Sequence, residues 1–293
     1  MNAITLLDGG MGQELVRRSG NKPTPLWATQ VMIDHPGMVA QIHRDYFDAG
    51  ASIATTNTYA IHRDRLEGTG MEARFHELLD RALDEAEGHR PAGARIAGSI
   101  GPLVASYRPE THPPHAEAVT KYAEVARALG PKVDLILCET VASLAHAKAV
   151  LEGAAAAGKP IWLSVTVDDE DGSKLRSGEA VSELCAIAGR AEALLANCSA
   201  PEAMASALLA LRGCGKPFGA YANGFTEITK DFLKDKPTSD ALVSRDITPE
   251  TYADFVEEWV GLGATIVGGC CEVGPAHIAA VAKRLTASGH QIG

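Results

Sequence analysis

The sequence has no long apolar run and no basic cluster, and it has few aromatic residues. No stretch of 18 uncharged apolar residues occurs in its 293 residues, which argues against a membrane-spanning helix. The 27 Lys and Arg are outnumbered by 37 Asp and Glu, and no basic run could neutralise a line of phosphates, so we expect no nucleic-acid partner. Hydrophobic residues make up 46% and charged residues 22%, a balance typical of a globular chain.

A secretory signal is also missing from the first residues. The opening MNAITLLDGGMG has neither a cationic nor a long apolar region, so we expect a cytoplasmic protein with reduced thiols. The six cysteines form no CxxC pair and no small disulfide framework. Cys185 and Cys214 are predicted to be isolated, buried, apolar residues, whereas the other cysteines are candidates for thiolates or metal ligands.

Short β-branched runs alternate with longer segments of helical periodicity along the whole chain. The predicted strands cover residues 4–7, 52–56, 95–99, 133–138, 161–167, 193–197, 218–221 and 265–268. Helical patterns follow them, for example at 116–129, 143–157, 179–190, 201–211, 249–262 and 275–286. Strict alternation predicts a parallel sheet, and we expect a single (β/α)8 TIM barrel spanning 1–293, with a loop insert at about 224–245.

Polar residues and thiols gather where these strands end, which is the active-site face of such a barrel. Cys198 follows the sixth strand and Cys270 and Cys271 follow the eighth, so barrel closure would bring the three together with one strand between them. Three thiolates suit a tetrahedral Zn²⁺ with its fourth position open, as in catalytic zinc sites. Small buried hydrophobes, or a redox pair at Cys270 and Cys271, are the alternatives.

Seven motifs together resemble the homocysteine S-methyltransferase family. They are LLDGGMGQEL from residue 6, TTNTY at 55–59, GSIGP at 98–102, CET at 138–140, NCS at 197–199, YANG at 221–224 and ITPETYADFVEEWVGLGATIVGGCC at 247–271. The motifs span almost the whole chain in order, and NCS followed by GGCC is highly specific. The resemblance implies that Cys198, Cys270 and Cys271 hold Zn²⁺ and that homocysteine sulfur takes the open position.

The resemblance also implies a substrate site around the metal. Asp8 and Glu139 are expected to receive the amino group of homocysteine, and the amides of Gly9 and Gly10 to approach its carboxylate. Asn223 matches a position near the metal. Other roles remain open for these residues: a helix N-cap for Asp8, a rim ion pair for Glu139 and an ordinary turn for Asn223.

The methyl donor must carry an activated methyl group, such as a sulfonium or quaternary ammonium. Tyr59, Tyr107, Tyr221 and Trp27 could offer a π face to such a cation, although rim packing is the alternative. Tyr59 precedes Ala60, where betaine-using relatives tend to have a second aromatic, and Glu272 stands where many relatives have Gly. Both differences affect which methyl donor is expected. The acidic run 168–171 is interpreted as a solvated turn, with a cation site as the alternative.

Together these patterns predict a zinc-dependent enzyme that methylates homocysteine to methionine. S-methylmethionine is the favoured donor and betaine the second. The partners are these small molecules, without nucleic acid or membrane, and a homo-oligomer is left open. A non-enzymatic zinc-binding or thiol redox-sensing barrel is the alternative function.

Overall fold

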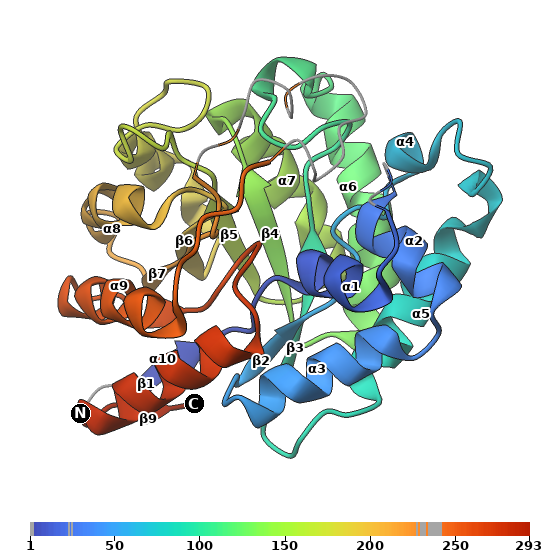
Figure 1. The fold of residues 1–293 in the computed structure, drawn as a ribbon. Coiled ribbons are helices and arrows are strands. Elements are labelled where there is room, and N and C mark those ends of the chain that lie inside the picture. Colours follow the sequence, from blue (N-terminus) through green and yellow to red (C-terminus); the bar gives the residue numbers. More distant parts are fainter. Residues whose placement is uncertain (1–2, 23, 25, 227, 229–232, 234–241) are drawn as a thin grey trace.

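The computed structural model describes residues 3–22, 24, 26–226, 228, 233 and 242–293 (Figure 1). Its strands are β1 (Ala3–Leu6), β2 (Ile53–Thr55), β3 (Arg95–Ile100), β4 (Leu135–Val141), β5 (Ile161–Val165), β6 (Ala193–Asn197), β7 (Phe218–Tyr221), β8 (Ile266–Val267) and β9 (Gln291–Ile292). Its α-helices are α1 (Met11–Ser19), α2 (Trp27–Asp34), α3 (Met38–Asp48), α4 (Arg63–Leu66), α5 (Phe75–Glu87), α6 (His115–Leu129), α7 (Leu144–Ala154), α8 (Met204–Arg212), α9 (Pro249–Gly261) and α10 (Pro275–Ala287). None of these helices has the length and apolar character that a bilayer crossing requires.

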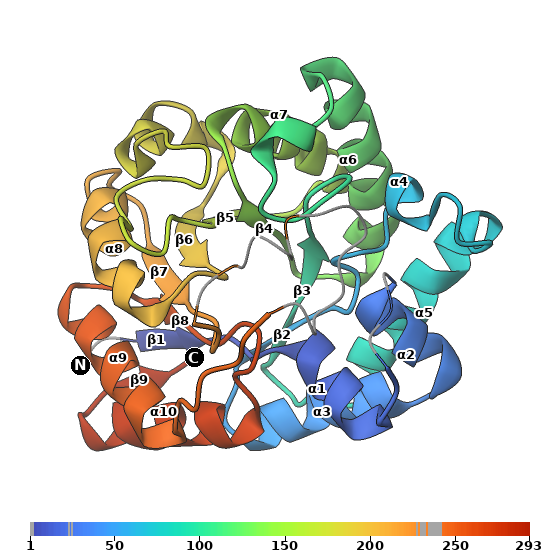
Figure 2. The ribbon, with the colours of Figure 1, turned by 45° about the horizontal axis from the view of Figure 1, so that its top comes forward.

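The strands form one parallel sheet in the order β2-β3-β4-β5-β6-β7-β8-β1-β9. The sheet curls until β1 approaches β2. Leu7 forms a parallel bridge with Ile53, and the amide of Ser52 donates to the Leu6 carbonyl at 2.8 Å. Figure 2 shows the strands around a common centre with helices outside them. The predicted parallel α/β fold, with eight strands from successive βα units, is confirmed.

Two sets of buried side chains stabilise this arrangement. The larger set lies between the sheet and the helices. The smaller set has members in or directly beside each strand from β1 to β8, and it comprises Leu7, Ile53, Ala97, Leu135, Leu137, Trp162, Ala193, Leu195, Tyr221 and Ile266. Because neighbouring side chains along a strand point to opposite faces, the two sets belong to the two faces of the sheet.

Two helices begin with the side-chain capping that their sequence indicates. The hydroxyl oxygen of Thr248 accepts from the amide of Thr251 at 3.1 Å, and Pro249 occupies the first turn of α9. At the start of α7, the Ser143 hydroxyl accepts from the His146 amide at 3.1 Å. These caps fix where each loop from a strand end returns into a helix.

The segment between β5 and β6 differs from the prediction. Instead of an α-helix over 179–190 it forms two 3-10 segments, η5 (Val181–Ala186) and η6 (Ala188–Arg190). Val181, Ser182 and Gly189 are poor helix formers. Cys185 of this segment is exposed and forms a disulfide with Cys214, just after α8. The prediction that these two cysteines are isolated, buried and reduced was therefore wrong.

The predicted loop insert at about 224–245 extends in large part outside the described residues. Its described ends pair with each other, because Phe225 bridges Ser244 and the amide of Thr226 donates to the Val243 carbonyl at 3.0 Å. A further element was not predicted. β9 adds to the start of β1, pairing Ala3 with Gln291 and Ile4 with Ile292.

Candidate active site

Three cysteines meet at the carboxyl ends of β6 and β8. The sulfur atoms of Cys198, Cys270 and Cys271 all lie within 4.8 Å of one another, and the described residues contain no other group of three metal-ligating side chains this close. In the structure Cys198 and Cys270 are joined as a disulfide, and Cys271 is a free thiol. This contradicts the expectation of reduced thiols at Cys198 and Cys270. The disulfide must be reduced before both sulfurs can act as thiolates.

Backbone contacts hold the three cysteines in place. Cys198 adopts a left-handed conformation with φ 49°, unusual for a residue with a side chain. Its amide donates to the Tyr221 carbonyl at 3.3 Å, and its carbonyl accepts from the Thr166 hydroxyl at 3.2 Å. The Cys270 amide donates to the Ala222 carbonyl at 2.9 Å. Cys198 and Cys270 are thus each tied to the end of β7, the strand that separates β6 from β8.

The environment of Cys271 disfavours a bare thiolate. Burial, followed by the charges of Glu272 and Glu139, raises the pKa of Cys271 to about 12. At neutral pH this thiol is protonated unless a cation offsets the charge of the thiolate. Three converging soft sulfur ligands in such a place fit a thiophilic metal ion, which would supply that cation.

Asp8 and Glu139 are buried carboxylates near the cysteines. Burial raises the pKa of Asp8 to about 7, despite the hydrogen bond that its Oδ2 accepts from the Thr55 amide at 2.7 Å. Burial likewise raises the pKa of Glu139 to about 6, and the charge of Glu139 raises that of Asp8 further. Neither carboxylate has an ion-pair partner among the described residues, so a cationic ligand would offset the cost of their burial. Helix α1 has Gly10, not Asp8, as its N-cap residue.

A distortion of β4 sets the position of Glu139. The register between β4 and β5 shifts between Cys138 and Val141, and Thr140 has φ 59°. The Asn197 side chain holds this bulge, accepting from the Thr140 amide at 2.9 Å and donating to the Thr140 hydroxyl at 3.1 Å. Such bulges re-aim side chains beside active sites.

Two hydroxyl groups fix the Glu139 carboxylate. Oε1 accepts a short hydrogen bond from Ser99, and Oε2 accepts from the Tyr221 hydroxyl at 3.1 Å. The motifs GSIGP and YANG contain these residues. Ser99 was given no role from the sequence, and Tyr221 was considered only as a π face for a cationic donor. Their place near the carboxyl ends of β3 and β7 was the available signal.

Gly9 and Gly10 pack directly on the segment that carries the cysteines. A Cβ on Gly10 would come within 2.5 Å of the Cys270 carbonyl oxygen, and a Cβ on Gly9 would overlap the Val273 carbonyl. The Gly10 amide already donates to that Val273 carbonyl at 2.9 Å, whereas no backbone acceptor for the Gly9 amide occurs in the described part of the chain. Close approach of β1 to the β8 loop therefore requires both glycines.

Asn223 and Tyr59 have local partners. The side-chain oxygen of Asn223 accepts from the Phe225 amide at 3.1 Å, and its backbone amide donates to the Ser199 carbonyl at 3.1 Å, so it shapes a turn beside the Cys198 loop. The Arg65 guanidinium lies 5.6 Å from the centre of the Tyr59 ring, and the Tyr59 hydroxyl bonds Ser106 at 2.7 Å. These are the turn and rim roles that the sequence left open.

One residue of the acidic run ties several loops together. Asp169 Oδ1 accepts from Arg176 and from the Ala200 amide, both at 2.8 Å, and its Oδ2 accepts from the Ile228 amide at 3.3 Å. Arg176 in turn lies 5.7 Å from the Tyr107 ring centre. Both Asp169 and Arg176 are only 13% exposed, so the solvated-turn interpretation was wrong for Asp169. The signal that was missed is a nearby arginine within the same loop.

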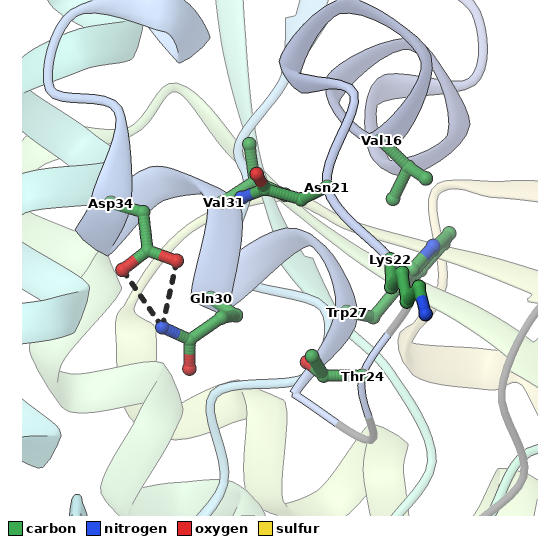
Figure 3. A pocket seen from close by; sticks show the side chains of 8 residues that line it. All are labelled: Val16, Asn21, Lys22, Thr24, Trp27, Gln30, Val31 and Asp34. Atoms are coloured by element: carbon green, nitrogen blue, oxygen red, sulfur yellow. Dashed lines mark hydrogen bonds between the residues drawn. The ribbon is translucent and has the colours of Figure 1, made fainter.

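A cavity of about 240 Å³ opens between α1 and α2, away from the cysteines. Figure 3 shows its lining, including Lys22, Gln30, Asp34 and Trp27. None of the strand-end carboxylates or cysteines lines it. Its connection to the site is indirect, through the Trp27 indole, which donates to the Gln13 side chain at 3.1 Å.

Comparison with known proteins gives one consistent result. The family model described as homocysteine S-methyltransferase matches residues 5–285. Homocysteine S-methyltransferase of Escherichia coli (strain K12) is 30% identical over 308 aligned positions, which cover 96% of this chain and 95% of that protein.

Solved structures agree. The homocysteine methyltransferase MmuM from Escherichia coli, in its metallated form, superposes with a TM-score of 0.81 at 26% identity, covering 97% of this chain and 96% of that one. The oxidised form of MmuM superposes with a TM-score of 0.81 at 27% identity, covering 96% of each chain.

Proposed function

Since the chain belongs to the homocysteine S-methyltransferase family and is an enzyme that methylates homocysteine, we propose that it does so with Zn²⁺ and a small onium donor. The observation that carries the proposal is the meeting of three cysteine sulfurs within 4.8 Å, close to two buried carboxylates. Membership of an enzyme family argues against the alternative of a non-enzymatic zinc-binding or redox-sensing barrel.

Cys198, Cys270 and Cys271, once reduced, would hold the metal. Three sulfur ligands favour Zn²⁺ over the hard cations Mg²⁺ and Ca²⁺, and three protein ligands leave a tetrahedral ion one open position. When bound, Zn²⁺ lowers the pKa of the substrate thiol that occupies that position, so that its sulfur is nucleophilic at neutral pH.

The buried carboxylates would bind the amino end of homocysteine. An ammonium group placed between Asp8 and Glu139 gains charge-assisted hydrogen bonds and neutralises two groups that have no ion-pair partner among the described residues. Ser99 and Tyr221 orient Glu139 for this contact, and Thr55 orients Asp8. The Gly9 amide is the donor for the substrate carboxylate, while Gly10 and Asn223 keep the cysteine loops in place.

The transfer itself needs alignment more than proton chemistry. The homocysteine sulfur forms a bond to the methyl carbon as the bond from that carbon to the donor's positive centre breaks, and that centre leaves as a neutral thioether or tertiary amine. The thiol proton is released to solvent before attack. S-methylmethionine is the favoured donor and betaine the second. Holding both substrates in line supplies much of the rate enhancement.

We also propose that the curled sheet is a closed (β/α)8 TIM barrel, forming a single domain over 1–293. The Leu7–Ile53 bridge and the buried side chains contributed along β1 to β8 support closure. In such a barrel the active site lies at the carboxyl ends of the strands, where these residues lie.

The decisive experiment combines metal analysis with a methionine assay. Cys271→Ser should lower both the zinc content of the reduced protein and the rate of methionine formation. Replacing Cys185 and Cys214 together by Ser is the matched control, because it removes two cysteines outside the three-cysteine site and should leave zinc content unchanged. Full activity in a Cys271→Ser protein shown to be free of zinc would refute the proposal.

A further inference from the structure

A chain of hydrogen bonds fixes the Glu272 carboxylate beside the cysteines. Its Oε1 accepts from the Gln13 side-chain amide at 2.6 Å, and the Gln13 carbonyl oxygen accepts from the Trp27 indole at 3.1 Å. Gln13 belongs to α1 and Trp27 begins α2. Two helices that follow β1 therefore hold a carboxylate in the loop after β8.

The backbone aims this side chain across the rim of the site. Glu272 directly follows Cys271 and has φ 66°, a conformation that costs free energy for a residue with a side chain. A Cβ built on Gly224 would lie 2.8 Å from the Glu272 Cβ, so the base of the side chain rests on the loop after β7. Its other end reaches Gln13 in α1, and the side chain thus spans the two sides of the rim next to Cys271.

The charge of Glu272 is uncompensated. Asp169 pairs with Arg176 at 2.8 Å and Glu202 pairs with Arg245. Glu272 forms no ion pair within the described part of the chain, and its one side-chain hydrogen-bond partner there is the neutral Gln13 amide. Yet it is half-buried, where a carboxylate loses part of its hydration. A cation at the rim would complete its environment.

We propose that Glu272, held by Gln13, is the specificity-determining contact for the positive charge of the methyl donor. This inference rests on the proposed function, which supplies a cationic co-substrate, and it names the group that selects it. A reduced, metal-loaded three-cysteine site beside a carboxylate is negatively charged, so it attracts sulfonium and quaternary ammonium compounds and repels anionic ones. The selection acts through charge, and shape plays the smaller part.

The test compares each onium compound with the isostere in which an uncharged carbon replaces its positive centre. S-methylmethionine is paired with homoleucine, and betaine with 3,3-dimethylbutanoate, and the dissociation constants are measured by calorimetry on the zinc-loaded protein without homocysteine. The wild type should prefer at least one onium compound to its isostere. Glu272→Gln should reduce that preference roughly tenfold, as expected for the loss of one partly screened charge contact. Glu272→Asp should retain most of it.

Two further variants guard against indirect effects. Glu258→Gln removes an exposed carboxylate from α9 and should leave the preference unchanged. Gln13→Lys places a cation beside Glu272 without altering the cysteine segment, so it should abolish the preference even if Glu272→Gln fails to retain zinc. Zinc content and melting temperature are recorded for each protein.

The outcomes separate the two proposals. If the wild type forms methionine and Glu272→Gln keeps the full onium preference, the role of Glu272 is overturned and the proposed function stands. Where Glu272→Gln loses zinc, the onium preference of Gln13→Lys decides in the same way. If no donor yields methionine but the preference exists and depends on Glu272, the proposed function fails and the onium contact stands. A wild type that prefers neither onium compound overturns the contact outright.

Discussion

Replacing Asp8 by asparagine should stabilise the protein at neutral pH while abolishing tight binding of homocysteine. The folded structure raises the pKa of Asp8 from 3.8 to about 7 through burial. The folded protein therefore binds this proton more tightly than the unfolded chain does. The stabilisation associated with the proton is complete below pH 3.8 and is lost as pH rises to about 7. Ionising the buried carboxyl costs about 4 kcal/mol over that window.

The amide introduced by Asp8→Asn cannot titrate and keeps an oxygen for the Thr55 amide. The free energy of unfolding of this variant should therefore exceed that of wild type by an amount that grows by about 1.4 kcal/mol per pH unit through the window. Urea unfolding of the reduced, metal-free proteins at several pH values between about 4.5 and 7 measures this slope. Asp48→Asn, which removes an exposed carboxylate from α3, is the matched control and should follow wild type. If the unfolding free energies of Asp8→Asn and wild type changed in parallel with pH, the buried Asp8 carboxylate would not be destabilising at neutral pH, and the prediction would be refuted.

Three further outcomes are expected. The KM for homocysteine should rise as pH falls from about 7 through 6, because protonated Asp8 and Glu139 cannot pair with an ammonium; initial rates would show it, and a flat KM would contradict it. Asp169→Asn should loosen the Cys198 loop and weaken zinc retention about tenfold in a chelator competition, whereas Asp168→Asn should not; equal retention would remove Asp169 from metal-site support. Replacing Cys185 and Cys214 by Ser should lower the unfolding free energy of the oxidised protein by about 3 kcal/mol; denaturation with and without reductant checks this, and identical curves would disprove the stabilisation.

Strand positions and the three cysteines followed from local patterns. Buried β-branched runs and apolar runs such as 193–197 are strands because they alternate with helices, and parallel strands place their carboxyl ends on one rim. Convergence of Cys198 with Cys270 then needed only the strand order. The family resemblance added the substrate, which neither periodicity nor spacing could supply.

Features that depend on contacts between distant residues were not predictable. β9 has two residues, too few for a pattern, and it pairs with Ala3 and Ile4 at the start of β1, ahead of the contact between β1 and β2. The segment 179–190 has helical periodicity, but residues with poor helix propensity and a disulfide leave it as two 3-10 pieces. Asp169 stands in an acidic run that looks solvated, and only the fold brings Ala200 and Ile228 to its carboxylate.

The meeting of β1 with the loop after β8 has a consequence for biosynthesis. Asp8 and Gly10 are made well before their partners Gly269 and Val273, which lie after β8. A nascent chain that stops after β7 would carry Cys198 and both acidic groups but would lack two of the three sulfurs. A metal ion held by all three sulfurs, as proposed, could therefore be captured only after Cys271 has been made, and products that terminate before β8 would not compete for it.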